Sequence, residues 1–144
     1  MSLFSGMNIS ASGMSAQRLR MDIIAQNIAN VQTTRDENGK PYRRKAVVFA
    51  EKNATPFQEV FMRTAGIIGS GVKVTKIVED RSPLRKVYDP THPDADEDGY
   101  VSYPNVNVVQ EMTDLIDATR SYEANVTAFN ATKNMALKGL EIGK

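Results

Sequence analysis

Cysteine is absent from the 144-residue chain, and histidine occurs once, at position 92. Without thiols there is no disulfide, no thiolate zinc site and no cysteine nucleophile. His92 stands between Pro90 and Pro93, and no serine lies in a recognisable nucleophile-elbow motif. A catalytic triad needs an oriented base and a nucleophile that it activates, so a structural turn is favoured over a hydrolase site here. We predict that the chain is not an enzyme and uses no cofactor.

A charge excess of one sign and a long apolar run are also missing. The 18 basic and 17 acidic side chains nearly cancel, so no overall field would attract nucleic acid or anionic lipid. The longest candidate for a membrane span, residues 21–31, is interrupted by an aspartate and three side-chain amides. No apolar run follows the first basic residue, Arg18, as it would in a secretory signal. We expect no membrane insertion, no nucleic-acid partner and export only by a dedicated machine.

The two ends of the chain show helical periodicity. Residues 5–31 contain no proline, and apolar residues recur there at spacings of three, four and seven. A second helix is expected after Asn107, which is a good N-cap with Gln110 three residues later; Gly139 or Gly143 would end it. We predict that both apolar stripes form subunit interfaces. The predicted interface residues are Met7, Met14, Met21, Ile24, Ile28, Val31, Met112, Leu115, Ile116, Thr119, Tyr122, Val126, Phe129, Ala136 and Leu140.

The middle of the chain is expected to be rich in short strands. A turn at Asn38-Gly39 leads to a strand within residues 42–50, and a second strand is expected at 72–78. Between them, residues 55–63 resemble a short helix with a capping box. Four prolines in residues 82–104 limit that region to short extended pieces at 84–88 and 100–103.

These segments predict an α+β fold, in which long N- and C-terminal helices pair as a coiled coil beside a small β-rich middle module. The boundaries are residues 1–35 for the first helix, 36–104 for the middle module and 105–144 for the second helix. Helices of roughly 40 to 55 Å exceed the about 26 Å diameter of a compact 100-residue domain. Periodicity alone leaves two interpretations open. The stripes are the core of an ordinary domain, which is the more common case, or they join copies into an assembly.

A family resemblance favours the second interpretation. Residues 12–19 (SGMSAQRL) and 27–31 (NIANV) resemble the N-terminal signature of flagellar axial proteins. The segments YRRK at 42–45, YDPTHPDAD at 88–96, GYV at 99–101, YPNVN at 103–107 and RSYEANV at 120–126 narrow the resemblance to basal-body rod proteins, and among these to the proximal rod.

The resemblance implies a structural subunit of the bacterial flagellar proximal rod, in the basal body outside the cytoplasmic membrane. It implies export by the flagellar type III apparatus without a cleaved signal peptide. Other rod proteins and further copies of the chain would be the partners. The terminal helices would line a tube around the export channel, with the β-rich module outside, and the assembly would transmit torque for motility.

Two charged motifs have an alternative interpretation. Residues 94–99 (DADEDG) imitate the start of a calcium-binding EF-hand loop, but Asn105 stands where a bidentate glutamate is needed, and an acidic surface turn is favoured over a metal-regulated module. The basic triplet at residues 43–45 is expected to be an exposed strand entrance or an intersubunit salt-bridge patch rather than a phosphate site.

Overall fold

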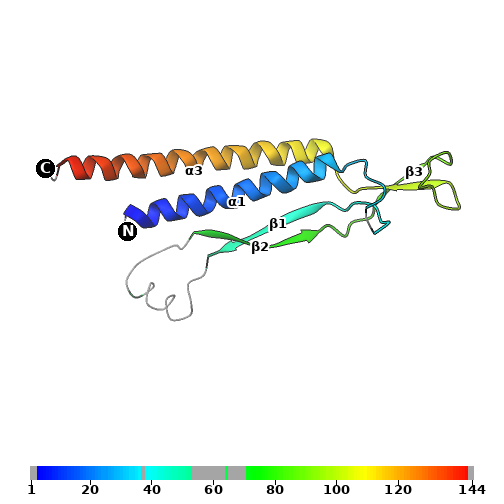
Figure 1. Ribbon diagram of the computed structural model, residues 1–144, viewed down its shortest axis with the longest axis horizontal. Helices are drawn as coiled ribbons and strands as arrows, with labels where there is room; N and C mark the ends of the chain where they lie inside the picture. The colour runs from blue at the N-terminus through cyan, green and yellow to red at the C-terminus, as the bar shows by residue number, and fades with distance from the viewer. Residues whose placement is uncertain (1–2, 37, 53–63, 65–70, 143–144) are drawn as a thin grey trace.

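The described residues of the computed structural model include two long antiparallel helices and two separate pairs of antiparallel strands (Figure 1). The structure describes residues 3–36, 38–52, 64 and 71–142. Helix α1 spans Leu3–Ala29 and helix α3 spans Val108–Ile142. Strands β1 (Lys45–Glu51) and β2 (Val72–Glu79) form one antiparallel pair, and β3 (Arg85–Tyr88) and β4 (Tyr100–Tyr103) form another. The α+β fold class is confirmed, whereas the coiled-coil geometry of the helix pair stays a prediction.

The start and end of each helix follow local hydrogen bonding. The side-chain oxygen of Asn107 accepts bonds from the backbone N–H groups of Val109 at 3.1 Å and Gln110 at 3.4 Å, so the predicted N-cap is confirmed. Helix α1 ends where the Val31 N–H turns to the Ile28 carbonyl at 3.3 Å, which tightens the last turn. Gly139 lies inside α3 rather than at its end. Of the two glycines predicted as possible ends of the helix, Gly139 is therefore excluded; α3 ends at Ile142, and Gly143 lies outside the described residues.

Helix α1 is the middle layer of the molecule. Figure 1 shows α3 along one side of it and the β1–β2 pair along the other, with both termini at the same end of the helix pair. The buried apolar side chains are few and include Ala16, Ile23 and Ile24 on α1 and Ala118 on α3. The core is therefore a narrow seam on either side of α1.

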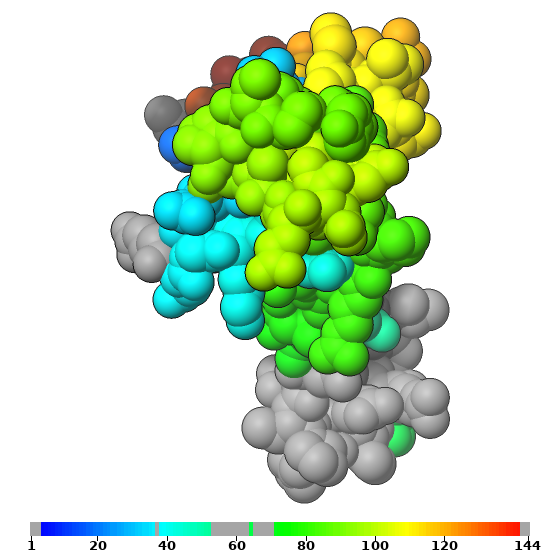
Figure 2. Space-filling view, turned by 90° about the vertical axis from the view of Figure 1, so that its right-hand side faces the viewer, coloured from blue at the N-terminus to red at the C-terminus, as the bar shows by residue number. Residues whose placement is uncertain are grey.

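The β3–β4 hairpin extends past the end of the helices that lies opposite the chain termini (Figure 1). Figure 2 looks at this end and shows the hairpin beside the loop that follows α1. The loop turns at Gly39, whose φ of 73° lies in the left-handed region that glycine tolerates best. Val101 on β4 is fully buried and anchors the hairpin.

The strands lie where the sequence predicts them. A register shift between Val48 and Phe49 leaves Thr75 of β2 without a direct partner, which is a β-bulge. The short helix predicted at residues 55–63 lies outside the described residues. Within the described part of the chain, neither helix is long and apolar enough to cross a membrane.

We predict opposite effects of the same substitution at two helical glycines. A Cβ at Gly13 of α1 would lie 2.6 Å from Oδ1 of Asn125 on α3, whereas a Cβ at Gly139 would meet nothing within 4 Å. Gly139→Ala should therefore stabilise the fold by about 0.5–1 kcal/mol through helix propensity. Gly13→Ala should lower stability, because the Asn125 side chain must leave its bond to the Ser121 carbonyl. Urea unfolding measures both, and equal gains would show that the helices do not approach this closely.

Candidate assembly interface

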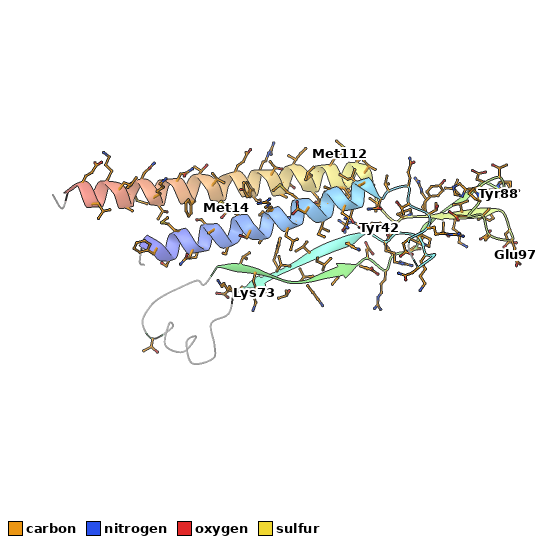
Figure 3. The ribbon with its side chains drawn as sticks, in the orientation of Figure 1. Met14, Tyr42, Lys73, Tyr88, Glu97 and Met112 are labelled. Atoms are coloured by element: carbon orange, nitrogen blue, oxygen red, sulfur yellow. The ribbon has the colours of Figure 1, made fainter. Side chains whose placement is uncertain are left out.

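The predicted stripe on α3 divides into two faces. Five of its members are half-buried along the side that packs on α1; these are Leu115, Tyr122, Val126, Phe129 and Ala136. Three others are exposed: Met112 by 54%, Ile116 by 53% and Leu140 by 72%. Thr119 is also exposed, but its hydroxyl donates to the Met21 sulfur of α1 at 3.5 Å. Figure 3 shows Met112 on the side of α3 that faces away from α1. Part of the stripe therefore holds the helix pair together, and part of it is open.

The predicted residues of α1 are covered to a greater extent. Ile24 is 5% exposed. Met7, Met14, Met21 and Ile28 are half-buried, and so is Val31, which lies just after the end of α1. Helix α1 has α3 on one side and the β1–β2 pair on the other, so its stripe serves packing within the chain.

Sequence reasoning missed part of the exposed apolar surface of α3. Val109 is 75% exposed, Met135 59% and Leu137 49%. Val109 precedes Met112 by three positions and Ile116 by seven, which places the three on one helical face. The spacing of these three residues is visible in the sequence. Only the structure shows that they form an exposed face of α3, separate from the face that packs on α1. We name Val109, Met112 and Ile116 the outer stripe; Leu137 and Leu140 are exposed near the C-terminal end of α3.

A buried polar cluster lies behind this surface, where α1, α3 and β1 meet. The amide of Asn27 on α1 is 0% exposed. Its Nδ2 donates to the Lys45 carbonyl at 2.8 Å and to Oε2 of Glu111 at 2.9 Å. Its Oδ1 accepts from the Lys45 N–H at 2.9 Å and from the Tyr42 hydroxyl at 2.9 Å. All four hydrogen-bonding positions of the amide are filled. We name Asn27, Tyr42, Arg44 and Glu111 the polar junction.

Glu111 is also fully buried, and its charge is balanced by Arg44. The Arg44 Nε donates to Glu111 Oε1 at 2.6 Å, and its terminal nitrogen lies 3.5 Å from Asp114. Arg20 of α1 approaches Asp114 at 3.7 Å. The Arg44 N–H donates to the Asn105 side chain at 2.9 Å, which ties the start of β1 to the segment before α3. The expected exposed or intersubunit role of the basic triplet is thus wrong for Arg44, because its charge pairs within the chain.

The surroundings of Tyr42 keep its hydroxyl protonated. Burial raises the pKa of Tyr42, and the carboxylates of Glu111 and Glu79 raise it further. A protonated hydroxyl is the state needed to donate to Asn27. At neutral pH the Tyr42 hydroxyl is therefore a donor to Asn27, and the Asn27 amide in turn donates to Glu111.

A second polar tie joins α1 to β2. The hydroxyl of Ser12 donates to the Ile9 carbonyl at 2.7 Å and accepts from the Val72 N–H at 3.0 Å. Gly71 has a φ of 90° and lies directly against Ser12, so a side chain there would be both strained and obstructed. Together with Asn27, this bond fixes the sheet along α1.

The acidic turn is held by contacts within the chain. Asp94 accepts from the Thr34 hydroxyl at 2.8 Å and lies 3.1 Å from Arg35. Asp96 accepts from the Tyr100 N–H at 2.7 Å. His92 accepts from the Asp94 N–H through Nδ1 at 3.1 Å, a role in the turn itself. Among the described residues, no three histidine or carboxylate side chains gather as metal ligands.

Comparison with known proteins identifies the family. Residues 7–35 match the family described as flagella basal body rod protein, and residues 97–142 match the C-terminal family of flagellar basal body rod FlgEFG proteins. The flagellar basal-body rod protein FlgC of Bacillus subtilis (strain 168) is 52% identical over the full length of both chains. The chain belongs to the FlgC family. The FlgC of Borreliella burgdorferi is 46% identical over 99% of this chain and 98% of its own, and that of Escherichia coli O157:H7 is 41% identical over both full lengths.

FlgC proteins are structural proteins of the flagellar basal-body rod. The predicted function, a structural subunit of the proximal rod, is thereby confirmed, and so is the prediction that the chain is not an enzyme. The chain's place is the basal body of the flagellum. The first matched segment contains Ser12 and Asn27, so it includes both ties between α1 and the sheet.

We predict that Asn27→Asp destabilises the fold by about 3 to 5 kcal/mol, the usual effect of breaking a buried charged network. The new carboxylate would face Glu111 and could not donate to it or to the Lys45 carbonyl. Asn8→Asp, an exposed position on the same helix, is the matched control and should change stability by less than about 0.5 kcal/mol. Urea unfolding followed by circular dichroism measures both variants. Similar stabilities would mean that the junction carries little of the fold.

We also predict that Thr91→Val raises the pKa of Asp89. The Thr91 hydroxyl, which donates to Asp89 at 2.6 Å, is the main cause that lowers this pKa. A lowered pKa in the folded state stabilises the fold above the carboxyl's ordinary pKa, and this contribution is lost as pH falls through the folded value. Thr91→Val should therefore reduce the acid-dependent loss of stability. Carboxyl-carbon NMR titration measures the shift, with Thr113→Val on α3 as the control; an unchanged Asp89 pKa would contradict the assignment.

Proposed function

We propose that the chain polymerises within the proximal rod through its terminal helices, and that the outer stripe of α3 contacts the neighbouring subunit. The observation that carries this proposal is the exposure of Val109, Met112 and Ile116 on one face. The opposite face of α3 is already packed on α1. A cover for the outer stripe must come from another chain, because large exposed apolar patches usually mark interaction sites.

The difference in helix length supports this arrangement. Helix α3 has 35 residues and α1 has 27, so α3 is longer by about 12 Å at 1.5 Å per residue. Gly6 lies beside Thr132 and Gly13 lies near Asn125, which sets the antiparallel register. In that register the last turns of α3, with Leu137 and Leu140, run past the start of α1 (Figure 1). These leucines are 49% and 72% exposed and are available to a second subunit.

The three predicted regions have separate roles in this proposal. Residues 1–35 and 105–144 form the packed helices, paired as a coiled coil and lining the wall of a tube around the export channel. Residues 36–104 form the outer module. The polar junction and the Ser12 tie connect the two, so torque applied to the helices passes to the module through short hydrogen bonds.

Assembly outside the cytoplasmic membrane would follow export by the flagellar type III apparatus without a cleaved signal. The partners would be other rod proteins and further copies of this chain. The chain is similar over nearly its full length to FlgC relatives that are named flagellar basal-body rod proteins, which supports this placement.

We predict that Met112→Lys combined with Ile116→Lys abolishes assembly but leaves the monomer folded. Both side chains are more than half exposed, so the isolated chain loses little. Burying each in an interface contributes about 1.5–3 kcal/mol, so the pair should weaken association at least about 100-fold. Sedimentation of the full chain with its rod partners and swimming of a complemented strain are the measurements.

The matched control is Ala124→Lys combined with Ala131→Lys, which adds the same charge at exposed positions of α3 outside the outer stripe. Circular dichroism should be unchanged for both double variants. Normal assembly and motility of the Met112→Lys/Ile116→Lys variant would refute the role of the outer stripe.

A further inference from the structure

We infer a second contact between copies of this chain, in which the outer face of the β1–β2 pair binds the end of the β3–β4 hairpin of another copy. The outer sheet face consists of Ala46, Val48, Ala50, Lys73, Lys76 and Val78. The hairpin tip consists of Tyr88, Asp96, Glu97, Asp98 and Tyr100. The inference depends on the proposed function only because copies of the chain must lie next to one another in the assembly. Neither of the two surfaces includes a residue of α1 or α3.

The strand register defines the outer sheet face. Directly paired residues point to the same side of a sheet, and so do residues two apart on one strand. Ala50 pairs with Lys73 and Val48 pairs with Lys76, so both lysines lie on one face. The opposite face carries Val47 and Phe49, which line a crevice with Ile23 and Ile24 of α1. Helix α1 therefore packs against part of the inner face, where Ile77 remains 47% exposed, and the lysine face points away from α1.

The outer sheet face has a basic and aliphatic character. Lys73 and Lys76 are exposed, and no acidic side chain shares the face with them. Val48 and Val78 lie between and beside the lysines and are half-buried. Such a surface suits a partner that presents carboxylates around a flat apolar group.

The hairpin tip has that composition. Residues 89–99 contain five carboxylates and no lysine or arginine. Glu97 and Asp98 are exposed, and neither makes a hydrogen bond or ion pair with any described residue. Tyr88 is 64% exposed and packs edge-to-face on Tyr100, with ring centroids 5.3 Å apart. Exposed tyrosines held rigid in this way are common anchors of protein interfaces.

The placement of the two surfaces requires two molecules. Figure 3 shows Glu97 at the far end of the β3–β4 hairpin and Lys73 toward the other end of the molecule. A single copy therefore cannot bring them together. A contact between different surfaces leaves a free tip on one copy and a free face on the other, so it can be repeated along a row or around a ring. The charge complementarity would favour encounter and set the register, while tyrosine burial would supply most of the affinity.

The absence of cysteine allows a direct test by disulfide cross-linking of the full chain. A Glu97→Cys copy is mixed with a differently tagged Lys73→Cys copy under mild oxidation. The matched control replaces Lys73→Cys by Lys133→Cys, an exposed lysine on α3. We expect a several-fold excess of mixed disulfide dimer over the control. A yield at the control level overturns the inference, whatever the outer-stripe variant does to assembly.

Exposed lysines on edge strands can also serve only to prevent aggregation of the sheet edge. Charge reversal distinguishes that role from a specific contact with the hairpin tip. Lys73→Glu with Lys76→Glu, made in a chain that carries a cysteine at Ala50, should lower cross-linking to Glu97→Cys several-fold. Asp98→Lys in the Glu97→Cys copy should restore it, because Asp98 is exposed and, among the described residues, makes no contact that holds the turn. Lysines that only guard the edge would show no restoration, and that result would also overturn the inference.

Discussion

The buried amide of Asn27 is the constraint on which the arrangement of the chain depends. A buried amide that lacks partners costs about 1–3 kcal/mol, and Asn27 finds its four partners on three other residues. These residues lie on α3, on β1 and in the segment before β1. Satisfying one side chain therefore fixes the relative positions of a helix pair and a sheet. Glu111 extends the constraint, since its buried charge requires Arg44 beside it.

This polar constraint matters more here than in an ordinary domain because the apolar core is narrow. Among the described residues, the buried hydrophobic side chains other than Val101 lie along the two sides of α1. Apolar contact is not directional, so a thin seam would permit sliding. The ties at Ser12 and Asn27 prevent it, since they are about 22 Å apart along α1 at 1.5 Å per residue. Two directional anchors at that separation keep the sheet from pivoting on the helix.

Periodicity predicted the helices and most strands, because those depend on spacing within one segment. It could not predict how the α3 stripe divides, since Leu115 and Ile116 are adjacent in the same pattern and only the position of α1 separates them. In the sequence, Asn27 is one of the amides that interrupt the apolar run at residues 21–31. Glu111 lies in the first turn of α3, where the helix dipole alone would favour an acid. The two residues are 84 positions apart in the chain, a pairing that no local pattern contains.

The two helices differ in how much of their surface the chain itself uses. Helix α1 is enclosed by α3 and the sheet, so its apolar positions hold the subunit together. Helix α3 is longer and is covered on one side only, so its remaining apolar positions are available to other subunits. A subunit that must be stable alone and still polymerise needs both kinds of surface. In the proposed assembly, the two kinds of surface would be used independently, because the outer stripe shares no residue with the polar junction that Asn27 and Glu111 maintain in the monomer.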